Sequence, residues 1–294
     1  METQNIEVKP KIGKWKASKI IVKESFNVLM QDKEVMWFPV MSAITTLLAA
    51  IILIATGYFV IFNGNIESVD LESNKTLSNV VIYSVLFICY LVGFFITNFF
   101  QAGLYLVVQS RFNGVNIGFK DGINEAKKHI NKIFVWSLIS ATVGLVLQII
   151  ADKFKLVGRI IASVFGAAWN ILTFFSLPAL IIGKTTIKES FNESATIIRK
   201  TWGETIIVNL GVTLFFSVIT FLVFALFIGL IVIVPTVGMI IPVGILFVIY
   251  VIAMSVVSST LGQIFKLVLY NYAKTGNIPA GFSADIVQAA IKTK

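Results

Sequence analysis

The chain has 294 residues, of which 57% are hydrophobic and only 13% are charged, and its mean hydropathy is +0.89. Soluble domains are about 45–50% apolar and about 25% charged, so this composition excludes an ordinary cytosolic enzyme and a disordered chain. One cysteine and one histidine exclude an internal disulfide and a histidine metal cluster, and what remains is a polytopic membrane protein.

Segments without Asp, Glu, Lys or Arg locate the predicted spans, because an ionised group at the bilayer centre costs several kcal/mol. The last of these segments, between Glu204 and Lys266, is too long for one crossing helix, and we expect it to turn back around Pro235 and Pro242. The prediction is an all-α bundle of six transmembrane helices in three hairpins, at about 36–62, 79–109, 133–151, 160–183, 206–234 and 241–271. Pro178 is expected to kink the fourth span.

Basic residues set the predicted orientation, because cytoplasmic loops are rich in Lys and Arg. Of the 24 Lys and Arg residues, 20 lie on the side that holds both termini, which predicts cytoplasmic ends in a prokaryotic plasma membrane. The net charge of +9 then follows from topology, and no nucleic-acid partner is expected. The predicted domains are a basic segment with an amphipathic helix at 1–34, the six-helix domain at 35–277, and an amphipathic segment at 278–294.

A short motif suggests an internal repeat. Lys23-Glu24-Ser25-Phe26 recurs as Lys188-Glu189-Ser190-Phe191, and in both copies a tryptophan follows the phenylalanine by eleven residues. A looser copy runs from Phe119 to Trp136. Three units are therefore predicted, each an amphipathic helix followed by a membrane hairpin. Chance is the alternative, because short matches are common in apolar sequence.

The segments that begin at Phe119 and Ile187 are predicted to be amphipathic helices, the second with a capping box formed by Thr186 and Glu189. Such helices can lie among lipid headgroups with their cations near anionic lipid, or they can cap the bundle from its cytoplasmic side, and the two roles are compatible. The candidate lipid-interface residues are Trp37, Phe119, Ile123, Trp136, Phe191, Trp202, Lys127, Lys128, Arg199 and Lys200.

Uncharged polar residues are the candidate chemistry inside the membrane, because no charged residue lies in the middle of a predicted span. Four amides could form a polar seam that lines a cavity for a lipid headgroup or a small amphiphile: Asn98, Gln101, Asn170 and Gln263. The alternative is that they join helices through hydrogen bonds, each worth about 0.6–2 kcal/mol. No cofactor and no metal is expected, and His129 is expected to be solvated.

Four short segments carry a resemblance to known proteins: Trp37-Phe38-Pro39, Ala168-Trp169-Asn170 followed by Pro178, Thr201-Trp202-Gly203-Glu204, and Tyr272-Ala273-Lys274-Thr275-Gly276. They resemble a family of prokaryotic six-span proteins of unknown function, over nearly the whole chain. The layout is also similar to the membrane domain of some glycerophosphodiester phosphodiesterases. This sequence has no counterpart of their catalytic domain, so the resemblance implies an integral membrane protein without a transferable reaction or site.

Two functions remain from the sequence. The first is a non-enzymatic membrane protein that organises lipid or a membrane protein complex through its amphipathic helices, with anionic lipids as partners and a protein partner or homo-oligomer as further possibilities. The alternative is a transporter or permease for a neutral or amphiphilic solute that uses the polar seam. No enzyme is expected, because the sequence shows no pairing of a nucleophile with a base.

Overall fold

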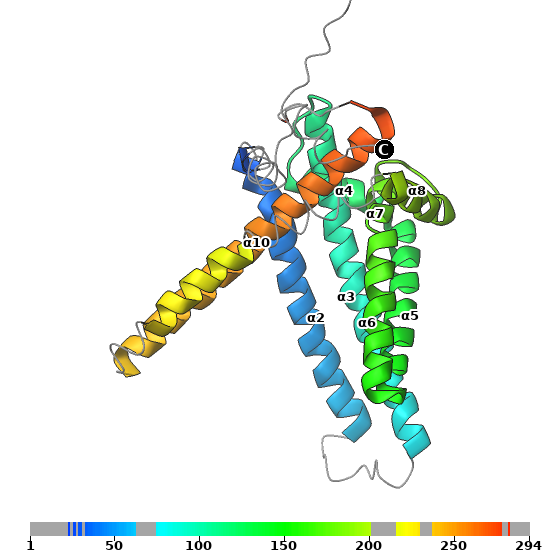
Figure 1. Cartoon of the computed structure of the whole chain (residues 1–294), viewed down its shortest axis with the longest axis vertical. Helices are drawn as coiled ribbons and strands as arrows, with labels where there is room; N and C mark the ends of the chain where they lie inside the picture. The colour runs from blue at the N-terminus through cyan, green and yellow to red at the C-terminus, as the bar shows by residue number, and fades with distance from the viewer. Residues whose placement is uncertain are drawn as a thin grey trace, which may run out of the picture. The chain divides into compact units, whose positions relative to one another are not determined.

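The computed structural model describes residues 23, 26–27, 29–30, 33–62, 75–200, 216–229, 237–277 and 282 (Figure 1). Every regular element in these residues is a helix. The chain divides into two compact units, of which the first is Lys33–Ile198 and the second contains the remaining described residues. The predicted all-helical class is therefore confirmed for the described residues, whereas most of the predicted terminal segments 1–34 and 278–294 lies outside them.

The described residues of the first unit form one 3-10 helix and seven α-helices, the last of which continues for two residues into the second unit: η1 (Lys33–Met36), α2 (Trp37–Phe62), α3 (Lys75–Phe112), α4 (Phe119–Lys127), α5 (Ile130–Lys153), α6 (Lys155–Leu172), α7 (Ser176–Ile181) and α8 (Ile187–Lys200). The second unit holds a helix at Phe216–Gly229 and α10 (Val237–Thr275).

In the described part of the chain, five helices are long and apolar enough to cross a membrane: Lys33–Phe59, Val80–Phe112, Ile130–Lys153, Lys155–Ile181 and Ile241–Thr275. They coincide with five of the six predicted spans. The remaining span, 206–234, contains the shorter apolar helix Phe216–Gly229, and its other residues lie largely outside the described ones. Six crossings in three hairpins therefore stay a prediction.

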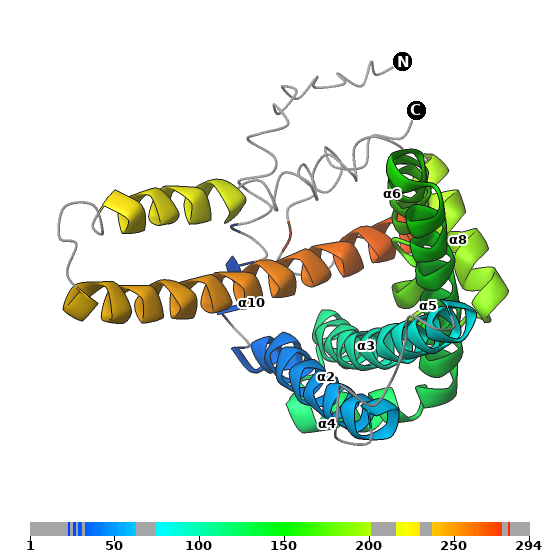
Figure 2. The same ribbon diagram turned by 90° about the horizontal axis from the view of Figure 1, so that it is seen from below.

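The four long segments of the first unit form a row. α2 contacts α3, α3 contacts α5, and α5 contacts α6, and Figure 2 shows them following one another along an arc. Apolar side chains along this row are exposed, for example Ile54 on α2 (71%) and Phe165 on α6 (64%). Such exposure is natural in lipid, where apolar side chains need no protein cover.

Buried side chains gather at one end of the first unit, where η1, α4, α7 and α8 lie; we call this the packed end (Figure 1). α3 has 38 residues and is about 57 Å long, whereas a hydrocarbon core is about 30 Å thick. Its last turns therefore have room to form a protein core outside the hydrocarbon. The buried residues there include Val35, Phe38, Ala102, Leu104, Tyr105, Val107, Val108, Ala126, Ile133, Phe175, Leu180 and Ile181.

The fourth predicted span is interrupted, as Pro178 led us to expect. α6 ends at Leu172 and α7 begins at Ser176, so the break lies just before the proline and Pro178 is the third residue of the new helix. A proline fits the first helical turn, where its missing N–H is not needed, but its ring would clash with the carbonyl four residues earlier in a continuous helix.

The expected turn around Pro242 needs a correction. α10 begins at Val237 and runs through Pro242, so Pro242 lies within a helix and is not part of the turn. The helix Phe216–Gly229 lies beside α10, with the rings of Phe227 and Phe247 stacked at 4.9 Å between centroids.

Candidate functional site

The helix α4 is fixed to the packed end at its first residue. The backbone N–H of Phe119 donates a hydrogen bond to Oε2 of Glu34 in η1 (3.2 Å), and the N–H of Gly118 donates to Oδ2 of Asp121 (3.1 Å). Carboxylates at this position satisfy free amide groups and match the positive end of the helix dipole. The ring of Phe119 also contacts that of Phe38 (4.6 Å between centroids), so this predicted lipid-interface residue is partly used in protein packing.

Two glycines allow α4 to lie close against α3. A Cβ atom on Gly122 would stand 2.5 Å from Cγ2 of Val107, 2.7 Å from Cζ of Phe38 and 3.1 Å from the carbonyl oxygen of Gly103. The reciprocal Cβ on Gly103 would stand 2.5 Å from Cε1 of Phe38. Sequence reasoning missed this contact. Its signal was a glycine within a predicted helix, which costs about 1 kcal/mol relative to alanine and needs a structural reason.

The outer side of α4 is polar and cationic. Lys120, Lys127 and Lys128 are exposed, and Nζ of Lys128 pairs with Oε1 of Glu125. Ile123 is partly exposed. The candidate cations of this helix thus face outward while its glycine side meets α3.

α8 begins with the predicted capping box. The N–H of Thr186 donates to Oε2 of Glu189 (2.9 Å), and the N–H of Glu189 donates to Oγ1 of Thr186 (3.3 Å). The hydrogen bond from the Thr186 backbone lowers the pKa of Glu189 below its usual value. The two ends of the box satisfy each other, which fixes where the helix starts.

Two contacts join α8 to the interrupted fourth span. The N–H of Phe175, freed by the break, donates to Oγ of Ser194 (2.9 Å), and both residues are buried. The ring of Phe191 lies 6.1 Å from that of Trp169 on α6. Ser194 is another residue that sequence reasoning missed, because its partner is a backbone group exposed only by the break.

Trp136, assigned to the lipid interface from the sequence, is buried within the protein in this structure. Trp136 is only 6% exposed and stacks on Trp169 at 6.2 Å, so the three rings of Trp136, Trp169 and Phe191 form a series from α5 through α6 to α8. Its indole meets aromatic protein surface instead of headgroups. A tryptophan at a span entry has the same sequence signature in either setting.

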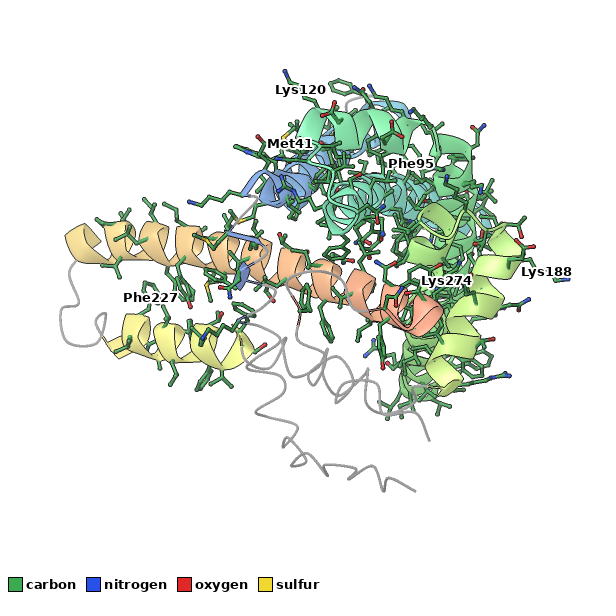
Figure 3. All side chains as sticks on the ribbon, turned by 90° about the horizontal axis from the view of Figure 1, so that it is seen from above. Met41, Phe95, Lys120, Lys188, Phe227 and Lys274 are labelled. Atoms are coloured by element: carbon green, nitrogen blue, oxygen red, sulfur yellow. The ribbon has the colours of Figure 1, made fainter. Side chains whose placement is uncertain are left out.

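The other interface candidates are distributed unevenly. Trp37 is 54% exposed and Arg199 is exposed. Trp202 and the side chain of Lys200 lie outside the described part of the chain. In Figure 3, Lys120 on α4 and Lys188 on α8 project away from the body of the first unit.

The predicted polar seam is not assembled in the first unit. Nδ2 of Asn98 donates to Oγ of Ser137 on α5 (2.9 Å), and this buried hydroxyl donates onward to the carbonyl of Ile133. Gln101 is partly buried on α3, and Asn170 is exposed on α6, whose main neighbour is α5. Gln263 lies on α10 in the second unit. For Asn98 the structure therefore favours the alternative, a hydrogen bond that joins two helices.

A cluster of basic side chains lies where α4 meets α5; we call it the cationic corner, and it comprises Lys128, Lys132 and Lys184 around His129. Nζ of Lys132 donates to the carbonyls of Thr185 (2.9 Å) and Lys184 (3.4 Å) in the loop before α8. Burial, together with the charge of Lys132, lowers the pKa of His129 below 6.5, so the imidazole is largely neutral near pH 7. His129 was expected to be solvated, and in the structure its side chain is partly exposed.

No group of three or more His, Cys, Asp or Glu side chains that could hold a metal ion occurs among the residues the structure describes.

Residues 80–282 match a protein family described as a family of unknown function (DUF6159), and this stretch is about two thirds of the chain. No curated protein and no solved structure matches. The expectation of a family without an assigned function is confirmed, whereas the similarity of layout to glycerophosphodiester phosphodiesterases is not shown.

Proposed function

The chain belongs to this family of unknown function, and from that premise we propose that it is a non-enzymatic integral membrane protein that organises anionic lipid at its cytoplasmic end. One observation carries the proposal. α4 and α8 both lie at the packed end, their inner sides are engaged by the spans, and their outer sides expose cations: Lys120, Lys127, Lys128, Lys188 and Arg199.

The depth of these helices favours lipid as the partner. Only two residues separate the end of α4 from the start of α5, and α8 is held against the end of the fourth span through Ser194. Each Lys or Arg at headgroup level attracts an anionic leaflet by about 1 kcal/mol. Because the rings of Phe119 and Phe191 already contact protein, attraction by cations is a better account than insertion of these rings into lipid.

The test compares two pairs of substitutions. Lys120→Gln with Lys188→Gln removes two exposed cations from the packed end, and Lys153→Gln with Arg159→Gln removes two from the opposite end of α5 and α6. Each protein is reconstituted in mixed phosphatidylcholine and phosphatidylglycerol, extracted into polymer nanodiscs, and its lipid shell is measured by mass spectrometry.

We expect phosphatidylglycerol to be enriched around the wild-type protein and around the Lys153/Arg159 variant. The Lys120/Lys188 variant should lose most of that enrichment, because about 2 kcal/mol of attraction is removed. Equal enrichment around all three proteins would overturn the proposal. Unchanged thermal unfolding of both variants in detergent is the control for folding.

A second function, binding or transport of an amphiphile, is favoured by a groove in the second unit. The groove has a volume of about 690 Å³ and lies between α10 and the helix Phe216–Gly229. Ser217, Thr220, Ser255, Ser258 and Ser259 line it together with Phe224 and Phe247. Hydroxyl groups beside aromatic rings suit a molecule with a polar head and an apolar chain.

A photoactivatable fatty acid tests this second function. It should label 216–229 and 251–259 in the wild-type protein, and Ser255→Phe with Ser258→Phe should abolish that labelling by filling the groove. Labelling that is spread over all spans and unaffected by the substitutions would count against it.

A further inference from the structure

The cationic corner at the packed end has an unbalanced charge. The groups that face His129 come from three elements: Glu125 and Lys128 at the end of α4, Lys132 on α5, and Lys184 in the loop between α7 and α8. Three of these four neighbours are cations. The corner joins two segments more than fifty residues apart in sequence.

The carboxylates nearby are already engaged. Oε1 of Glu125 pairs with Nζ of Lys128 at 2.5 Å. Oε2 of Glu189, which is near enough to sense Lys132, accepts the N–H of Thr186. Lys132 and Lys184 thus have no carboxylate within ion-pair distance among the described residues.

The lack of a carboxylate partner is most unfavourable for Lys132. Its ammonium is partly buried and its hydrogen bonds go to two carbonyl oxygens, which orient it but do not neutralise it. A partly buried charge without a counter-ion is unfavourable, and an anion from outside would relieve the cost. The corner lies at the start of the candidate span Ile130–Lys153, so the predicted topology puts it near the depth of lipid phosphates.

We propose that this corner is a phosphate site, in which Lys132 and Lys184 pair with phosphate oxygens and His129 donates a hydrogen bond. The phosphate of an anionic phospholipid and inorganic phosphate share this chemistry. The proposal rests on the proposed function only in taking lipid as a source, and the exposed cations Lys120 and Lys188 are not part of it.

The single histidine of the chain provides a direct probe. An untagged protein labelled with ¹³C at the imidazole Cε1 gives one histidine signal, whose titration by NMR reports the pKa of His129. In phosphatidylcholine nanodiscs we expect a midpoint below 6.5, because burial and the neighbouring cations oppose protonation. A phosphate bound beside the ring favours the protonated form and should raise the midpoint by about one pH unit.

Four additions distinguish the sources of the effect. Phosphatidic acid and phosphatidylglycerol supply lipid phosphate, inorganic phosphate supplies the free ion, and oleate supplies an anionic surface without phosphate at a matched zeta potential. The rise should be larger with the phospholipids than with oleate. A rise with inorganic phosphate alone identifies the free ion as the source, and a rise with the phospholipids alone identifies the lipid.

Three variants test whether the rise in the His129 midpoint arises from phosphate bound at the cationic corner. Lys184→Gln should reduce the phosphate-specific rise at least about threefold, and Lys132→Gln should do the same, while Lys120→Gln should keep it. Since Lys132→Gln also removes hydrogen bonds within the fold, Lys184→Gln, whose side chain is exposed, keeps the test valid if the first variant fails to fold.

Two results would overturn the phosphate site: no rise with either phospholipid or inorganic phosphate beyond that with oleate, or an unchanged rise in Lys184→Gln. The proposed function fails separately, through lipid enrichment that is insensitive to Lys120 and Lys188. Failure of one experiment therefore leaves the other interpretable.

Discussion

Gly103 and Gly122 have only hydrogen for a side chain at the place where α3, α4 and the ring of Phe38 meet. The closest atoms to an added Cβ belong to Phe38 and Val107, which are themselves buried, so neither can move into open space. The position of α4, and with it the outward direction of its cations, therefore requires that residues 103 and 122 have no Cβ atom.

Gly122→Ala should destabilise the protein by about 1–3 kcal/mol, because the added methyl group overlaps atoms in a full core. Gly93→Ala on α3 is the matched control, since nothing lies within 4 Å of its added Cβ. Thermal unfolding in detergent measures both. Equal melting temperatures for Gly122→Ala and wild type would show that α4 does not lie as closely on α3 as described.

The hydrogen bond between Asn98 and Ser137 should stabilise the contact of α3 with α5 by about 0.6 kcal/mol. A double-mutant cycle with Asn98→Ala and Ser137→Ala, measured by steric trapping in bicelles, should return a coupling of this size. Asn170→Ala should change the free energy of unfolding little, because Asn170 is exposed. A coupling of zero would return Asn98 to the list of candidates for a polar seam.

At the scale of elements, two carboxylates anchor two helices independently. Glu34 holds the start of α4 from another element, whereas Glu189 holds the start of α8 from within. Glu34→Ala should speed amide hydrogen exchange in 119–122 about fivefold and leave 187–190 unchanged, since losing this cap costs about 1 kcal/mol. Glu189→Ala should speed exchange in 187–190 and leave 119–122 unchanged, because it removes the acceptor of the Thr186 N–H. Faster exchange in both helices from either change would mean that α4 and α8 open together.

Protonation of Glu189 in acid should weaken the start of α8. The pKa of this carboxyl is lowered in the folded state, so its contribution is complete above 4.5 and is lost as the pH falls through the lowered value. Protection of the first turn of α8 in the wild type should therefore decline below pH 4.5, and Glu189→Ala should remove this part of the pH dependence. An identical decline in the variant would assign it to other groups.

The spans could be predicted from sequence because their signal is strong and local. Charged residues are excluded from hydrocarbon, so the segment without charges between Glu34 and Glu67 locates α2 to within a few residues. Helix α5 extends a few residues beyond its predicted span of 133–151 at both ends. Two features of the packed end depend on contacts between segments that are distant in the sequence, and they could not be predicted from it. An apolar side chain has the same sequence signature against lipid as against protein, which is why the burial of Trp136 was missed. Ser194 has a partner only because the fourth span breaks.

At the scale of the whole chain, the number of crossings decides the side on which each segment lies. Five helices among the described residues are long and apolar enough to span a membrane, and an odd total for the chain would place the two termini on opposite sides. The predicted orientation, which puts 20 of the 24 Lys and Arg residues on the side of both termini, requires an even total, and the sixth crossing at about 206–234 stays a prediction. The helix Phe216–Gly229 lies within that range and gives it a physical basis.

Reporters that are active on only one side of the membrane test this count. Fusions of alkaline phosphatase and of green fluorescent protein after residues 116, 185 and 294 should all report the cytoplasm, and fusions after residues 70 and 233 should report the exterior. The fusions at 116 and 185 place α4 and α8, on which the proposed lipid surface depends, independently of the second unit. A cytoplasmic signal at 185 with an exterior signal at 294 would reduce the count of crossings to five and would leave the packed end on the cytoplasmic side. An exterior signal at 116 would instead place Lys120 on the outer side, away from the anionic inner leaflet.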